Sequence, residues 1–296
     1  DPLTKSYFWH PAYNFYPVVG VNWKQARAFC IWRTELMNSA TDEKKGEADI
    51  VDFRLDLPAT IYFGGDQPLV ISKSIIINGP GADLLAISGN ESVRVLEFNN
   101  YGQPILVSIS GLTIRDGRES QGGGIYVGEN AEVTVTDCVI GPNNIVTYAG
   151  GGIAVSGGTL TLNRSTVVEN HGTGTLGGAG IVSVGSNSIV NLINSTVKDN
   201  TAQASNGGGI YAFFNTLVVL DRSTISGNSA NVGGGLRTLG DVEIVNSTIS
   251  GNTSTGWHGG VIFHTDGNME ILNSTIANNK GPDWAPSAIF NGSFGG

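Results

Sequence analysis

A short motif that returns at a fixed interval constrains the fold of this chain more than any other feature. In most copies Ser or Thr precedes an aliphatic residue and Asn follows it three positions later; the aliphatic members are Ile114, Ile140, Val167, Val197, Ile225, Ile249 and Ile276, at a mean spacing of 27 residues. A second motif alternates with the first and consists of Gly-Gly-Gly, or a near variant, followed by Ile125, Ile153, Ile181, Ile210, Leu236 or Val261. Such regular self-similarity predicts a solenoid in which each repeat forms one coil.

The residues inside each repeat indicate strands rather than helices. Aliphatic residues separated by one polar residue recur, as in Val133/Val135 and Leu160/Leu162, and β-branched residues dominate between frequent glycines. The consensus of leucine-rich repeats is absent. We therefore expect an all-β fold, a right-handed parallel β-helix over residues 51–296, in which each coil of about 27 residues holds about three short strands.

Coils that stack about 4.8 Å apart place equivalent side chains directly above one another. The asparagines that follow the aliphatic column are expected to bond to one another in a structural ladder; its members are Asn143, Asn170, Asn200, Asn228, Asn252 and Asn279. Two positions before the aliphatic column lies a set of small residues that we expect to face inward: Cys138, Ser165, Ser195, Ser223, Ser247 and Ser274. We interpret Cys138 as a small buried residue in place of Ser and not as a redox group.

The N-terminal part of the chain differs in composition. Residues 1–41 are rich in aromatic side chains and contain a predicted helix, Val21–Asn38, in which Asn22 is the N-cap and Gln25 completes a capping box. The polar stretch 42–50 reads as a connector. Because a solenoid leaves open strand edges at its ends, we expect this helix to cover the N-terminal end. The coil pattern still runs at residue 296, so the solenoid is expected to continue or to be covered by another subunit, which would allow end-to-end self-association.

Charge and composition exclude several classes of partner. Residues 51–296 carry the whole net charge of −9, and such an acidic chain lacks the basic stripe that binds nucleic acid. No apolar run approaches the roughly 18 residues of a membrane span. Two cysteines do not make a disulfide framework. No cofactor or metal is expected, because the histidines lack metal-ligand spacing and the glycine-rich repeat that binds Ca²⁺ in toxin-type β-helices is missing.

The repeats resemble those of a known group of proteins. The Gly-Gly-Gly-Ile and Ser-Thr-Ile-x-x-Asn motifs look like those of polymorphic outer-membrane-protein-like adhesins and of large secreted bacterial β-helix proteins, and the segment 71–89 is similar to the entry coil of the second group. The resemblance covers residues 51 to about 290. It implies the β-helix fold and an extracellular or cell-surface location in bacteria. It implies little about function, because this fold hosts adhesins and polysaccharide enzymes alike.

Residues 7–38 carry a second resemblance. The stretch His10-Pro-Ala-Tyr13 and the segment from Tyr16 to Arg33 resemble a fragment of the formylglycine-generating-enzyme-like family, in its gliding-motility lipoprotein branch. The part of that family that bears its active-site cysteines has no counterpart here, and Cys30 matches no catalytic position. No activity is therefore implied. A fusion or composite sequence is the alternative to a native cap.

One cluster near the C-terminal end could carry chemistry. Glu243 and Glu270, six positions before the aliphatic column, are expected to face outward on adjacent coils. Arg237 and His264, twelve positions before that column, are likewise expected to lie next to each other on adjacent coils. These four residues are the catalytic candidates of an alternative hypothesis, a polysaccharide lyase or glycoside hydrolase of the β-helix type. A row of outward threonines, one to a coil from Thr166 to Thr275, would also suit ice binding, although a single row fits any exposed strand.

The expectation that we favour is a non-catalytic protein. A β-helix at the cell exterior would act as an adhesive or structural shaft, and its repeated outward Thr, Asn and Ser side chains suit shallow contacts with glycans or surface proteins. No catalytic or metal-binding residue is assigned under this reading.

Overall fold

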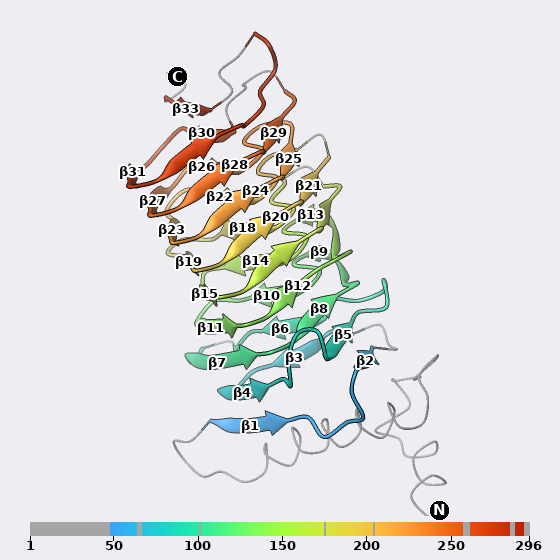
Figure 1. The fold of residues 1–296 in the computed structure, drawn as a ribbon. Helices are drawn as coiled ribbons and strands as arrows, with labels where there is room; N and C mark the ends of the chain where they lie inside the picture. Colours follow the sequence, from blue (N-terminus) through green and yellow to red (C-terminus); the bar gives the residue numbers. More distant parts are fainter. Residues whose placement is uncertain are drawn as a thin grey trace, which may run out of the picture.

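The computed structural model describes residues 48–63, 67–100, 102–174, 176–203, 205–256, 261–284 and 288–292. These residues form an all-β parallel solenoid of about nine turns with about 27 residues per coil, and they contain no helix. Figure 1 shows the coils piled along one axis, from β1 (Asp49–Asp52) to β33 (Ile289–Asn291). The predicted all-β parallel solenoid is confirmed.

Three parallel sheets of nine strands run the length of the solenoid, and each turn adds one strand to each sheet. Sheet A consists of β1, β4 (Ile75–Asn78), β7 (Ile105–Ser110), β11 (Ala131–Thr136), β15 (Thr159–Asn163), β19 (Ile189–Ile193), β23 (Leu217–Asp221), β27 (Asp241–Val245) and β31 (Met269–Leu272). Sheet B consists of β2 (Ala59–Tyr62), β5 (Leu85–Ser88), β8 (Thr113–Arg115), β12 (Val139–Ile140), β16 (Thr166–Val168), β20 (Thr196–Lys198), β24 (Thr224–Ser226), β28 (Thr248–Ser250) and β32 (Thr275–Ala277).

Sheet C follows in each coil, and a short fourth sheet lies between B and C in the middle coils. Sheet C consists of β3 (Leu69–Ile71), β6 (Leu96–Phe98), β10 (Ile125–Val127), β14 (Ile153–Ser156), β18 (Ile181–Val184), β22 (Ile210–Ala212), β26 (Leu236–Thr238), β30 (Ile262–His264) and β33. Sheet D consists of β9 (Arg118–Gln121), β13 (Ile145–Ala149), β17 (His171–Gly172), β21 (Thr201–Ala202), β25 (Ser229–Ala230) and β29 (Thr253–Ser254).

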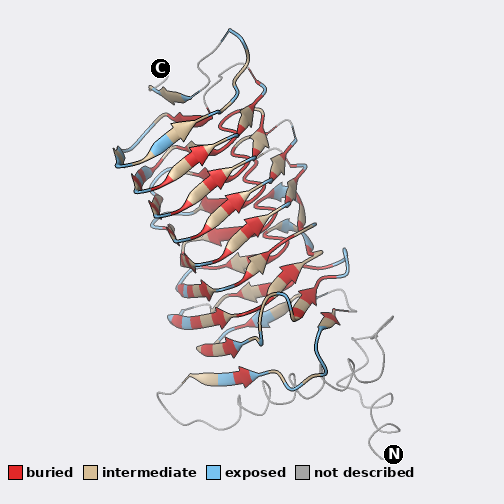
Figure 2. Cartoon of the chain, in the orientation of Figure 1, coloured by how far each residue is buried: buried red, intermediate tan, exposed pale blue. Residues whose placement is uncertain are grey.

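Aliphatic columns fill the interior, because alternate side chains of every strand point inward. In β15, for example, Leu160 and Leu162 are buried while Thr161 between them faces outward. The predicted column of sheet B is fully buried from Ile114 to Ile249. Figure 2 shows that buried residues dominate the strands of the middle coils and become scarcer in the last coil, where Ile276 is only partly buried.

The start of the solenoid differs from the prediction by two residues, and the predicted N-terminal helix lies outside the described residues. Strand β1 begins at Asp49, two residues before the expected start at 51, because Asp49 and Ile50 pair with Ile75 and Ile76 of β4. The first turn of the solenoid thus uses the last residues of the predicted connector. The predicted helix Val21–Asn38, with the rest of residues 1–47, lies outside the described residues, so the N-terminal cap stays a prediction.

The Gly-Gly-Gly motif lies just before sheet C, and the predicted position of its last copy is wrong by one residue. The aliphatic residues after it pair from coil to coil as expected, but Leu236 pairs with Ile262 and not with Val261. Val261 instead takes the place of the third glycine, and its carbonyl accepts hydrogen bonds from the backbone of Gly235 and Leu236. The last copy of this motif was therefore assigned one residue too early.

Candidate functional site

An asparagine ladder runs through the turn that follows sheet B. The Nδ2 atoms of Asn144, Asn170, Asn200 and Asn228 each donate to Oδ1 of the Asn in the next coil at 2.9 Å, and Asn252 donates to Asn279 at 3.1 Å. Each Nδ2 also donates to a backbone carbonyl of the preceding coil, such as Ile140 for Asn170. The predicted ladder is confirmed as a structural feature, because these amides satisfy one another and the backbone.

One predicted member of the ladder was wrong. Asn144 takes the place that the sequence assigned to Asn143, because Gly141-Pro142 adds one residue between Ile140 and the ladder position. Asn143 is exposed and adopts a left-handed conformation with a φ of 63°. In later coils Glu169 and Asp199 hold this same left-handed position, directly before the ladder asparagine.

A second ladder, of hydroxyl groups, lies at the turn between sheets A and B. The backbone N–H of each member donates to Oγ of the next, at 3.0 to 3.1 Å, in the order Cys138, Ser165, Ser195, Ser223, Ser247 and Ser274. At the start of this series Leu112 N–H donates to Cys138 Sγ at 3.4 Å. Cys138 is a buried free thiol that takes the place of Ser, as predicted, and burial raises its pKa to about 11.

The four catalytic candidates do not form one cluster. Glu243 and Glu270 are exposed and directly paired on β27 and β31 of sheet A, as expected. Arg237 and His264 lie in sheet C, and they are not paired with each other: Arg237 pairs with Phe263, whereas His264 pairs with Thr238.

The position of His264 relative to the two glutamates has a simple cause. The segment from His264 to Met269 is one residue longer than the segment from Thr238 to Val242 with which it pairs, so counting back from the aliphatic column places His264 one residue off. His264 therefore points into the interior, where it is buried and its Nε2 lies 3.2 Å from the Gly267 carbonyl. His264 thus lies inside the solenoid, whereas the two glutamates are exposed on its outside.

The outer face of sheet B carries a regular column of residues that stack from coil to coil. Residues of all nine coils stack in register, and seven of the nine are Thr: Thr60, Ala86, Thr113, Val139, Thr166, Thr196, Thr224, Thr248 and Thr275. The threonines among them are half-buried or exposed, so their hydroxyl and methyl groups can reach a ligand. This column is longer than the row of five threonines, from Thr166 to Thr275, that the sequence predicts.

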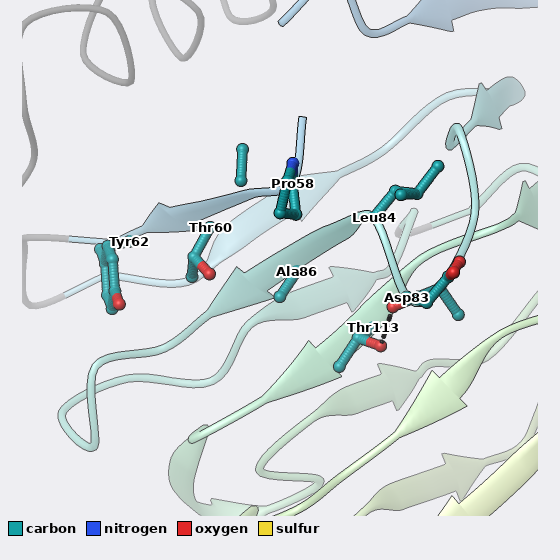
Figure 3. Close-up of a pocket in the computed structure, with 9 residues that line it drawn as sticks. Pro58, Thr60, Tyr62, Asp83, Leu84, Ala86 and Thr113 are labelled. Atoms are coloured by element: carbon teal, nitrogen blue, oxygen red, sulfur yellow. Dashed lines mark hydrogen bonds between the residues drawn. The ribbon is translucent and has the colours of Figure 1, made fainter. Parts of the chain in front are cut away.

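A shallow pocket of about 380 Å³ lies at the N-terminal end of this column. Thr60, Ala86 and Thr113 lie between Tyr62 on one side and the turn that carries Asp83 on the other (Figure 3). Thr113 Oγ1 donates to the carbonyl of Ala82 at 2.6 Å and so fixes that turn. An aromatic ring beside a few polar groups is a common lining of sites for small ligands. The residue pattern does not predict this pocket, because the lining residues come from three coils.

In the part of the chain that the structure describes, no group of three or more His, Cys, Asp or Glu side chains could hold a metal ion. No helix among those residues has the length and hydropathy needed to cross a bilayer.

The fold and its ladders define the class of this protein, a parallel β-solenoid with an asparagine ladder. Compared with known proteins, the chain matches no family model, and no curated protein or solved structure is significantly similar to it.

Proposed function

We propose that the chain is a non-catalytic adhesive or structural shaft at the outside of a bacterial cell. The observation that supports this proposal best is the pair of ladders in its interior. Asparagine side chains link six coils and Ser or Cys side chains link a similar stretch, in addition to the sheets themselves. Such in-register bonding makes neighbouring coils move together, and a rigid rod holds an outer face in fixed geometry.

The outer face of sheet B is the binding surface that we propose, with glycans or surface proteins as partners. The stacked threonines offer short hydroxyl groups at a regular spacing, and the pocket between Tyr62 and Asp83 adds a ring and a carboxylate. A flat surface of this kind favours several weak contacts along an extended partner, whose total affinity comes from multivalency.

A binding and turnover assay tests the proposal. The full chain is applied to an array of neutral and acidic glycans, and the same glycans are incubated with it and analysed for shortened or unsaturated products. We expect binding without products, and weaker binding after Tyr62→Ala but not after Tyr148→Ala, an exposed tyrosine of sheet D. Product formation that Glu270→Gln abolishes would instead support the lyase or hydrolase alternative.

Two finer features belong to the same proposal. We infer a right-handed coil, because parallel strands joined by crossover connections are right-handed in about 98% of cases. End-to-end self-association of the shaft stays a prediction, and sedimentation velocity over a range of protein concentrations tests it. A single species at all concentrations would contradict it.

A further inference from the structure

On the outer face of sheet C a guanidinium group lies between two aromatic rings. The register of β22, β26, β30 and β33 places Tyr211, Arg237, Phe263 and Phe290 one above the other. Arg237 Cζ lies 5.0 Å from the ring centroid of Tyr211 and 5.6 Å from that of Phe263. Phe263 stacks in turn on Phe290, with 4.6 Å between the ring centroids. The two rings therefore fix the position of this cation.

Arg237 has no hydrogen-bond acceptor in the part of the chain that the structure describes. Its side chain is half-buried, and its Nε–H is fully buried without a partner. No described carboxylate forms an ion pair with it, although the chain carries a net charge of −9. Ring faces attract the positive charge, but they leave the N–H donors of the guanidinium unsatisfied. Such a group is expected to have an acceptor.

Arg94 provides an internal comparison, because it also lies over a ring. Its Cζ is 4.8 Å from the ring centroid of Tyr126. Unlike Arg237, it pairs with Glu97 and donates to the backbone carbonyls of Gln121 and Gly122. Arg94 is thus a structural cation, because each of its three guanidinium nitrogens donates to an acceptor inside the fold. Arg237 has the aromatic contacts of such a residue but lacks the acceptors.

We propose that Arg237 binds the carboxylate group of an acidic saccharide. A guanidinium can donate two parallel hydrogen bonds to one carboxylate, a geometry that lysine cannot provide. The half-buried side chains of Phe213 and Leu239 supply an apolar surface beside it, and the buried ring of Tyr211 supports Phe213, with 4.4 Å between the ring centroids. The C–H face of a sugar ring packs on such a surface.

The charge of the chain narrows the ligand further. The net charge of −9 on the chain repels a densely charged polyanion, and a single guanidinium does not offset that repulsion. We therefore expect a saccharide with isolated carboxylates, as in glycans that alternate uronic acids with neutral sugars. An acidic protein segment would also present carboxylates, but it does not need the flat apolar flank. This site goes beyond the contacts proposed for sheet B, because it lies on another sheet, and either proposal can fail without the other.

Calorimetry of the full chain tests the assignment. The probes are a disaccharide that contains glucuronate and the matched disaccharide that contains glucose. We expect the wild-type chain to prefer the acidic probe. Arg237→Gln should weaken its binding about ten- to hundredfold, the effect of losing a charge-assisted hydrogen bond, and Arg237→Lys should weaken it less. Arg222→Gln is the matched control, since Arg222 is exposed and paired with Asp221.

Several outcomes would overturn the assignment. These are equal affinity for both disaccharides, unchanged binding by Arg237→Gln, or tighter binding of an acidic peptide than of the saccharide at Arg237. Melting temperatures show whether each variant folds. If Arg237→Gln does not fold, the ¹⁵N resonance of the wild-type Arg237 Nε–H decides: it shifts when the acidic disaccharide is added, or the proposal is wrong.

Discussion

The side-chain oxygen of Asn200 accepts two hydrogen bonds from Asn170, one from Nδ2 at 2.9 Å and one from the backbone N–H at 3.0 Å. Both residues are fully buried. One amide oxygen therefore satisfies a side-chain donor and a backbone donor of the coil before it, while its own Nδ2 continues the ladder to Asn228. In the later coils, too, each asparagine oxygen accepts one side-chain and one backbone hydrogen bond from the asparagine of the coil before it.

Replacing Asn200 by Ala should lower the free energy of unfolding by about 2–5 kcal/mol, because two buried donors of Asn170 lose their acceptor. Asn200→Asp should also destabilise, since a carboxylate keeps the acceptors but cannot donate to Asn228 and buries a charge. Urea unfolding followed by circular dichroism measures both changes. Thr196→Ala, on the outer face of the same coil, is the control, with an expected loss below about 1 kcal/mol. Equal losses for Asn200→Ala and the control would contradict a stabilising ladder.

The neighbours Asn143 and Asn144 should respond very differently to substitution. Asn144 Oδ1 accepts from the backbone of Gly117, and its Nδ2 donates to Ile114 and Asn170. Asn144→Ala should therefore cost about 2–4 kcal/mol of unfolding free energy. Asn143→Gly should change it by less than about 1 kcal/mol, because glycine adopts the left-handed conformation of this exposed position readily. The reverse order in urea unfolding would place the ladder at Asn143 after all.

This pair illustrates how far the sequence could predict the structure. The ladders, the inward aliphatic column and the pairing of Glu243 with Glu270 all follow from counting residues, because most coils keep the same length between these positions. Counting fails wherever one coil gains a residue, as at Gly141-Pro142 and in the turn before β31. A slip of one residue moves a side chain to the other face of a strand, which is why His264 was expected beside Arg237.

The sites that sequence reasoning missed depend on contacts between coils. The pocket beside Tyr62 combines residues of three coils. The contacts of Arg237 depend on the Tyr211 ring of the coil before and on the Phe263 ring of the coil after. The sequence does contain a signal for the stacking of these three side chains. Tyr211 and Arg237 both directly follow the aliphatic residue of the Gly-Gly-Gly motif, and Phe263 follows Ile262 in the same way once that copy is aligned correctly.

Close approach of the coils explains the glycines before sheet C, and it makes a further prediction. A Cβ atom on Gly180 would lie 2.5 Å from the carbonyl oxygen of Gly209 in the next coil. Because the sheets hold the coils at a fixed spacing, Gly180→Ala should destabilise by about 1–3 kcal/mol. Gly172→Ala is the matched control, since its Cβ would meet nothing closer than 3.5 Å. Thermal melting should show a clear decrease for Gly180→Ala alone, and similar melting temperatures for the two variants would refute the steric explanation.

Cys138 allows a test of the hydroxyl ladder by pH and by chemical labelling. Burial raises the pKa of its thiol to about 11, well above the value of about 8.5 for an exposed thiol. The native chain should thus keep Cys138 protonated at pH 8 and react slowly with thiol reagents. The measurement uses a Cys30→Ser background, so that Cys138 is the sole cysteine. Rapid labelling at pH 8 without denaturant would contradict a buried, protonated thiol.

The same shift fixes the pH dependence of stability. Since the pKa is higher in the folded chain, the contribution of the thiol is complete below about pH 8.5 and is lost as pH rises toward 11. Cys138→Ser should remove this loss. At pH 7 it should change the unfolding free energy by less than about 1 kcal/mol, because Ser can accept from Leu112 N–H and donate to the Thr136 carbonyl, as the thiol does. Urea unfolding of both chains at pH 7 and pH 10 measures the difference, and a Ser variant that is much less stable at pH 7 would mean that the position requires sulfur rather than a member of the hydroxyl ladder.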